Sequence, residues 1–267
     1  MRIIDKGSGP PLVLIPRLEG RWEFMGRAID ALARSFRVIT FPLCGEPDAD
    51  APYEPARGLD DYVAQVGAVL DRVGVDRAVV CGVSFGAVVA VQFAAAHPAR
   101  TTALVVATAP EPLFHLKRRH SLYARAPWLF GPVFLFEAQR RLRPELKAAI
   151  PAARDRIRFA LDQARTFVGA PISLGRMAAR ARLISTLDLT AECVRIAAPT
   201  LVITGEAALD KVVPSNGSSD YVRLIAGARQ VVLERTGHQG VMTRPEAFAA
   251  LVADFAKEGG ALGSNAA

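Results

Sequence analysis

The chain has 267 residues, of which 51% are hydrophobic, so it can bury the core of one large domain and is not disordered as a whole. Its net charge is +7 at pH 7, and its three cysteines, Cys44, Cys81 and Cys193, show no spacing typical of a metal site or a disulfide framework. Charged residues follow Met1 directly, and no apolar run approaches the roughly 18 residues of a membrane span. We therefore expect a cytoplasmic protein with no metal and no other cofactor.

Short apolar runs rich in Val, Ile and Leu alternate along the chain with amphipathic stretches. The apolar runs, which we expect to be strands, cover residues 12–15, 37–41, 78–81, 103–106, 201–204 and 230–233. The amphipathic stretches, which we expect to be helices, cover residues 22–35, 59–73, 85–97 and 245–257. The runs are continuous rather than alternating, as in strands that are buried on both faces. This order of elements predicts an α/β fold with a mostly parallel, doubly wound sheet.

Residues 111–190 interrupt this alternation, because the gap between the flanking strands is too long for a simple crossover connection. Prolines divide the gap into what look like several short helices; they are Pro110, Pro112, Pro127, Pro132, Pro144, Pro151 and Pro171. We expect a helical cap at 111–190, a core formed by 1–110 and 191–258, and a flexible tail at 259–267.

The positive charge of the chain lies mostly in this expected cap, which holds 15 Lys and Arg against 6 Asp and Glu. A basic segment can attract nucleic acid, anionic lipid or an acidic substrate. No nucleic-acid motif accompanies it, and its basic residues follow helical spacing. We therefore interpret them as a solvated helix face, and we expect no nucleic-acid partner and no membrane association.

The pentapeptide Gly82-Val83-Ser84-Phe85-Gly86 lies between the expected strand 78–81 and the expected helix 85–97. In such a strand–turn–helix setting, a tight turn exposes the serine Oγ, and the flanking glycines let the backbones pass closely. The following helix N-terminus offers N–H groups to a developing oxyanion. We predict that Ser84 is a catalytic nucleophile; the alternative is that it only caps the helix.

A serine hydroxyl needs a base to remove its proton, and the chain has four histidines. His238 follows the last expected strand, at the sheet edge where open α/β sheets place their sites, and we predict that it is the base. His97 ends a helix before a proline, and His115 and His120 lie in a basic stretch, so packing or a solvated face is the default for these three.

The base in turn needs a carboxylate that fixes its tautomer and stabilises its charged form. Asp210 lies on the loop after the expected strand 201–204 and precedes His238, which gives the chain order Ser, Asp, His. We predict that Asp210 is this acid, although it could also be a turn or helix-cap residue. The alternative acids are Glu206 and, more weakly, Asp188 and Asp220.

Over nearly its whole length the chain resembles the α/β-hydrolase superfamily. The resemblance rests on strand 12–15 with its loop, the motif at 82–86, the run 199–206, the segment 210–214 and Gly237-His238. It implies the α/β-hydrolase fold, with roughly eight strands, a helical cap inserted after the sixth strand, and a Ser–His–Asp triad. It also implies an oxyanion hole formed by the backbone N–H groups of Phe85 and Leu18. Residues 2–5 leave room for one strand before 12–15, so we expect the first strand or two of this pattern to be missing.

Two features depart from the family pattern. Arg17 lies in the loop 16–22 where His-Gly is usual, so it could crowd the oxyanion loop or place a cation at the pocket mouth, and Pro16 removes a backbone donor. Asp210 lies two residues further from Gly205 than is usual, but it heads the familiar Asp-x-Val-Val-Pro pattern.

These residues lead to one main hypothesis, a serine hydrolase that cleaves a carboxylic ester or related acyl bond through an acyl-enzyme. Trp128, Phe130 and Phe134 belong to an apolar stretch at 124–136, and we expect them, with Arg17, to contact the apolar acyl or aromatic group of a small-molecule substrate. Packing of this stretch on the core and docking to a membrane are the alternatives. A ligand-binding or inactive family member, an acyltransferase and a carbon–carbon bond hydrolase stay open, as does the oligomeric state.

Overall fold

The computed structural model describes residues 1–213 and 215–258, and it gives the backbone alone at 132, 134–136, 139 and 215–217. The tail that we expected at 259–267 therefore lies outside the described residues.

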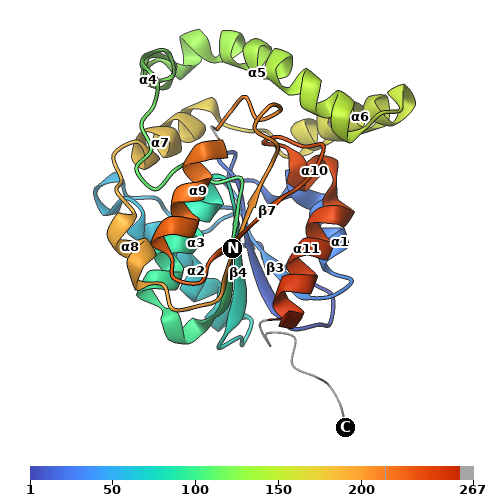
Figure 1. Cartoon of the computed structure of the whole chain (residues 1–267). Helices are drawn as coiled ribbons and strands as arrows, with labels where there is room; N and C mark the ends of the chain where they lie inside the picture. The colour runs from blue at the N-terminus through green and yellow to red at the C-terminus, as the bar shows by residue number, and fades with distance from the viewer. Residues whose placement is uncertain (214, 259–267) are drawn as a thin grey trace.

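Within the described residues, a sheet of seven strands runs through the centre of the molecule (Figure 1). In chain order the strands are β1 (Ile4–Lys6), β2 (Pro11–Ile15), β3 (Arg37–Thr40), β4 (Ala78–Val83), β5 (Thr101–Ala107), β6 (Thr200–Thr204) and β7 (Arg229–Val232). Their order across the sheet is β1-β3-β2-β4-β5-β6-β7. Strand β1 pairs antiparallel with β3, and every other neighbouring pair is parallel. The predicted mostly parallel sheet is confirmed, and β1 is the one described strand that precedes β2.

Two hydrophobic cores lie on opposite faces of this sheet, which explains the continuous apolar strands. In β2, Leu12 and Leu14 belong to one core, whereas Val13 and Ile15 belong to the other. Because successive side chains of a strand point to opposite faces, a strand between two cores must be apolar at every position.

Helices cover both faces of the sheet. Helices α1 and α11 lie on one face, and α2, α3, α8 and α9 lie on the other (Figure 1). Their bounds are α1 (Gly26–Leu32), α2 (Asp60–Arg72), α3 (Phe85–Ala96), α8 (Thr190–Arg195), α9 (Ser215–Leu224) and α11 (Pro245–Glu258). Short 3-10 turns lie at η1 (Trp22–Met25), η2 (Pro55–Arg57) and η3 (Pro98–Arg100). The predicted helix at 22–35 is therefore a 3-10 turn followed by a short α-helix.

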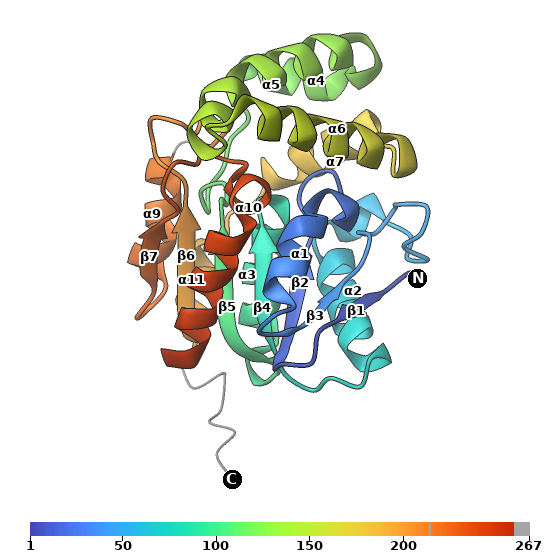
Figure 2. The same cartoon turned by 90° about the vertical axis from the view of Figure 1, so that its right-hand side faces the viewer.

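The segment between β5 and β6 forms a helical layer over the carboxyl ends of the strands (Figure 2). It contains α4 (Arg118–Arg125), α5 (Pro127–Ala149), α6 (Ala153–Gly169) and α7 (Leu174–Ile184), which we call the cap helices. We expected this insertion after the sixth strand of the family pattern, and in the structure it follows β5, the fifth of the described strands. Among the described helices, none combines the length and the apolar character that crossing a membrane requires.

Helix α5 corrects the expectation that prolines divide this segment into short helices. It runs for 23 residues, with Pro132 and Pro144 inside it. Each of these prolines removes one backbone donor, but the helix continues beyond both. Tertiary contacts with α4, α7 and α10 (Gly240–Thr243) supply the stability that local propensity lacks.

Candidate active site

Ser84 lies at the sharp turn between β4 and α3. Its backbone has φ 55° and ψ −114°, a strained conformation for a residue other than glycine. A Cβ added at Gly86 would lie 2.2 Å from the carbonyl oxygen of Ile15, so only glycine fits where α3 meets the loop after β2. The Ser84 side chain makes no capping hydrogen bond to α3. The Ser84 hydroxyl is therefore not a helix cap, and it lies half-buried at the turn.

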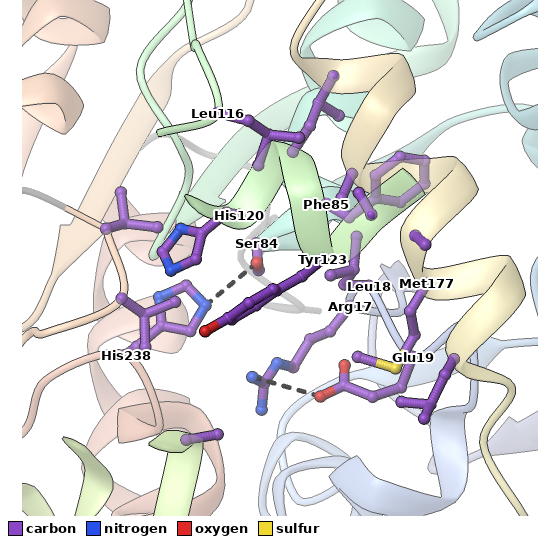
Figure 3. Close-up of a pocket in the computed structure, with 18 of the residues that line it drawn as sticks. Arg17, Leu18, Glu19, Ser84, Phe85, Leu116, His120, Tyr123, Met177 and His238 are labelled. Atoms are coloured by element: carbon purple, nitrogen blue, oxygen red, sulfur yellow. Dashed lines mark hydrogen bonds and ion pairs between the residues drawn. The ribbon is translucent and has the colours of Figure 1, made fainter. Parts of the chain in front are cut away.

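His238 reaches Ser84 from the loop after β7. Its Nε2 lies 3.2 Å from the Ser84 Oγ, within hydrogen-bond distance, and Figure 3 shows the two side chains pointing toward one another. The His238 side chain is only 4% exposed. Two other histidines have different surroundings: His97 packs on Phe93 at the end of α3, and His120 hydrogen-bonds with Arg141.

Asp210 lies behind His238, on the loop after β6. Its Oδ2 is 3.7 Å from Nδ1 of His238, and its other oxygen accepts backbone hydrogen bonds of 2.9 Å from Val212 and Val213. The two loops are in close contact, since a Cβ at Gly237 would lie 2.6 Å from the carbonyl oxygen of Leu209. The sequence-predicted Ser, His and Asp side chains are therefore adjacent in the structure.

The carboxyl of Asp210 is ionised at neutral pH. Burial on its own would raise its pKa, but the interaction with His238 and the two backbone N–H groups outweigh burial and hold the pKa below its ordinary value. In a Ser–His–Asp triad, an ionised carboxylate at this place stabilises the positive charge that forms on the histidine ring during the reaction.

The alternative acids are engaged elsewhere. Glu206 accepts a hydrogen bond of 2.6 Å from the backbone N–H of Arg235. Asp188 accepts one of 2.9 Å from the N–H of Thr190, and Asp220 forms an ion pair with Arg223. The structure thus favours Asp210 as the partner of His238.

The two expected oxyanion donors, Phe85 and Leu18, both line the cavity above Ser84. Gly86 brings the two segments together, because its Cβ position is also only 2.5 Å from the carbonyl oxygen of Pro16. No hydrogen bond between described residues uses the backbone N–H of Phe85 or of Leu18 as donor. Both N–H groups can therefore donate to an oxyanion bound beside Ser84.

Arg17 turns from the oxyanion loop to the loop of His238. Its Nη1 donates to the side-chain oxygen of Gln239 at 2.6 Å and lies 3.2 Å from the sulfur of Met242. Its Nη2 is 3.6 Å from Glu19, and Figure 3 shows this ion pair. The residue is 6% exposed and also lines the cavity. Its guanidinium is thus held in the wall, and it joins two loops of the site.

A cavity of about 310 Å³ lies between Ser84 and the cap helices. Its wall is mostly apolar, with Leu116, Tyr123, Phe130, Leu174 and Met177 contributed by the cap segment. His120 and Arg141 are polar exceptions on the same side. A chamber of this size and character suits the apolar part of a small substrate.

The expected pocket residues of α5 have different outcomes. Phe130 lines the cavity and stacks with Tyr123 at a centroid distance of 5.4 Å. Trp128 corrects our expectation: it is 80% exposed and does not line the cavity. The reason is helical geometry, since residues two apart lie on opposite sides of a helix. The side chain of Phe134 lies outside the part of the chain that the structure describes.

Glu145 of α5 is a residue of the site that the sequence did not indicate. It is fully buried, and its Oε1 accepts a hydrogen bond of 2.7 Å from the backbone N–H of Gln239, the residue after His238. Its neighbours Arg143 and Pro144 are exposed, and no local pattern marks Glu145 as buried.

Comparison with known proteins agrees with this architecture. Residues 12–251 match the model of the alpha/beta hydrolase family, so the chain belongs to this family. It is 29% identical to the 2-hydroxymuconate semialdehyde hydrolase of Pseudomonas sp. (strain CF600), with 95% of this chain and 89% of that protein covered. It is 26% identical to the pimeloyl-[acyl-carrier protein] methyl ester esterase of Nitrosomonas europaea, with 93% of this chain and 96% of that protein covered.

Among solved structures, the enol-lactonase from Burkholderia xenovorans LB400 matches with a TM-score of 0.75 at 22% identity and covers 96% of each chain, which shows a shared fold. The curated relatives are hydrolases. Together with the family match, this identifies the chain as a hydrolase.

Proposed function

We propose that this protein hydrolyses carboxylic esters with an apolar acyl or aromatic group, through an acyl-enzyme formed on Ser84. The observation that carries the proposal is the 3.2 Å contact between His238 Nε2 and Ser84 Oγ at the floor of an apolar cavity, with ionised Asp210 behind His238. This arrangement has a nucleophile, a base and an orienting acid in the order that acyl transfer requires.

The reaction would proceed in two halves. In the first, Ser84 Oγ attacks the carbonyl carbon of the ester, and the hydroxyl proton passes to His238 Nε2. The carbonyl oxygen becomes an oxyanion, which accepts hydrogen bonds from the backbone N–H groups of Phe85 and Leu18. The carbon–oxygen bond to the alcohol then breaks, and His238 gives its proton to the leaving oxygen. In the second half, a water molecule attacks the acyl-enzyme by the same route and releases the acid and free Ser84.

The substrate class follows from the cavity wall. Apolar side chains from the cap segment face Ser84. Binding of an apolar acyl or aromatic group there is therefore stabilised by about 25 cal/mol for each Å² of apolar surface removed from water. The volume of about 310 Å³ suits a small molecule rather than a long chain.

The first experiment compares wild type, Ser84→Ala and His238→Ala on p-nitrophenyl esters of increasing acyl length. Each substitution should lower kcat by several orders of magnitude, because nucleophile and base act as a unit. Ser35→Ala is the matched control, since Ser35 is exposed and does not line the cavity. If Ser84→Ala kept most of the activity, the proposal would be wrong.

Fluorophosphonate labelling separates this enzyme from a ligand-binding family member, because only an activated serine reacts readily. A mass shift on the peptide that contains Ser84 supports the proposal. An unlabelled Ser84 in the folded protein would favour the binding alternative.

The likeness to a 2-hydroxymuconate semialdehyde hydrolase favours a second candidate, carbon–carbon bond hydrolysis by the same three residues. We therefore add 2-hydroxymuconate semialdehyde, the compound in the name of this relative, to the panel of p-nitrophenyl esters. A kcat/KM for this compound well above the value for each p-nitrophenyl ester would replace the ester proposal.

A further inference from the structure

The loop that carries His238 is attached to the cap by a buried carboxyl group. Glu145 of α5 has no solvent exposure, and its Oε1 accepts the Gln239 N–H at 2.7 Å. This hydrogen bond joins positions 94 residues apart in the chain. Burying a carboxyl group costs free energy unless hydrogen bonds replace its contacts with water. The burial of Glu145 against the residue that follows His238 therefore needs an explanation.

Gln239 is held from a second side by the oxyanion loop. Its side-chain oxygen accepts from Arg17 Nη1 at 2.6 Å, and Arg17 is itself buried. The backbone of Gln239 therefore meets the cap, while its side chain meets the loop after β2. We call the contacts among Glu145, Gln239 and Arg17 the Gln239 bridge.

His238 depends on its loop because, among the described residues, its side chain makes one hydrogen bond, to Ser84. The 3.7 Å separation of its Nδ1 from Asp210 is longer than a hydrogen bond, and Nδ1 is buried without a hydrogen-bond partner among the described residues. The backbone next to His238 must therefore set the direction in which its ring approaches Ser84. The Gln239 bridge fixes that backbone.

We propose that Glu145 is a positioning residue that aligns His238 with Ser84 by holding the Gln239 N–H, with Arg17 holding the same residue from the oxyanion side. The inference rests on the proposed function, since it assigns Glu145 and Arg17 to the same triad. In this proposal Arg17, which departs from the family pattern, fixes the position of the oxyanion loop relative to His238. It also makes the alignment of the base depend on the docking of α5.

The position of Glu145 is suited to a hydrogen-bond acceptor rather than to a free charge. Burial raises the pKa of its carboxyl, and nearby Asp210 adds to this. The backbone N–H groups of Gly237 and Gln239, and the charge of His238, oppose the rise without reversing it. The Oε2 atom is buried with no hydrogen-bond partner among the described residues. A neutral amide that keeps the acceptor should therefore replace the carboxyl well.

The test compares Glu145→Leu, which keeps the bulk but not the acceptor, with Glu145→Gln, which keeps both. The measurements are kcat and KM on a p-nitrophenyl ester, the second-order rate of fluorophosphonate labelling of Ser84, and Tm. For Glu145→Leu we expect kcat and the labelling rate to fall together by roughly 10- to 100-fold, because small misplacements of reacting groups cost this much. KM should stay within about threefold, and Glu145→Gln should restore kcat to within about threefold of wild type.

Arg143→Leu is the matched control, because Arg143 is an exposed charged residue on the same helix. It should behave like wild type in all measurements.

Arg17→Met tests the other end of the bridge and should also lower kcat and the labelling rate by roughly tenfold or more. Combined with Glu145→Leu it should add little, because both substitutions act through Gln239. If Glu145→Leu does not fold, Arg17→Met and Glu145→Gln still decide the matter.

The outcomes separate this inference from the proposed function. An unlabelled wild-type Ser84 would refute the proposed function itself. Normal labelling of wild type, with Glu145→Leu or Arg17→Met labelled at the wild-type rate, would refute the positioning role alone. Equal losses in Glu145→Leu and Glu145→Gln would likewise refute it, since the acceptor would then be irrelevant.

Discussion

Replacing Asp210 by Asn tests how much the carboxylate contributes to the base. In the transition state His238 carries a positive charge, and Asp210 Oδ2 lies 3.7 Å from its Nδ1. At this distance, with an effective dielectric constant of about 20, the attraction between the two charges is about 4 kcal/mol. An amide loses this attraction, and about 4 kcal/mol corresponds to roughly a thousandfold in rate. We therefore expect Asp210→Asn to lower kcat about a thousandfold.

The assay is steady-state hydrolysis of a p-nitrophenyl ester at pH 7, with Tm as a check of folding. KM should change by less than about threefold, because Asp210 does not line the cavity. Asp220→Asn, which removes an acid from a surface ion pair, should leave kcat unchanged. The reasoning is refuted if Asp210→Asn keeps more than about a tenth of kcat, and a large loss in Glu206→Gln instead would show that the acid is Glu206.

Three further predictions concern the turn at Ser84, the cavity and stability in acid. Gly86→Ala should destabilise the protein by about 1–3 kcal/mol, measured as a lower Tm, because its Cβ would lie 2.2 Å from a backbone oxygen. Gly26→Ala is the control and should not lower the Tm, because a Cβ there would meet no atom within 4 Å. Phe130→Ala should shift the preference of kcat/KM toward bulkier acyl groups, while exposed Trp128→Ala should leave it within about twofold. The lowered pKa of Asp210 means that its carboxylate stabilises the folded protein at pH values above the ordinary pKa of about 3.9. This stability is lost as pH falls through the folded pKa, so the Tm difference between wild type and Asp210→Asn should shrink as the pH is lowered below about 5.

Local sequence patterns were sufficient to predict the sheet and the neighbourhood of Ser84. Each predicted strand is found with ends that differ by at most two residues, because buried parallel strands are short continuous apolar runs between loops. The positions of Ser84, Asp210 and His238 also followed from their strands, since the carboxyl ends of parallel strands meet at one edge. Their roles in the chemistry stay predictions.

The features that sequence reasoning missed depend on contacts between distant parts of the chain. For Arg17 the sequence left two alternatives, crowding of the oxyanion loop or a cation at the pocket mouth, and it did not indicate the partner 222 residues away that Arg17 reaches. Glu145 carries no local signal, and its burial results only from the docking of α5 on the loop of His238. Trp128 and Phe130 belong to one apolar run, and only the rotation of α5 on the core decides which of them lines the cavity.

The most direct test of the central claim is to trap the acyl-enzyme. Wild-type protein is mixed with a p-nitrophenyl ester, quenched in acid within milliseconds to seconds, and digested for peptide mass spectrometry. We predict a mass increase equal to the acyl group on the peptide that contains Ser84, and no such increase in Ser84→Ala. Rapid turnover with an unmodified Ser84 peptide, together with undiminished activity of Ser84→Ala, would contradict the account.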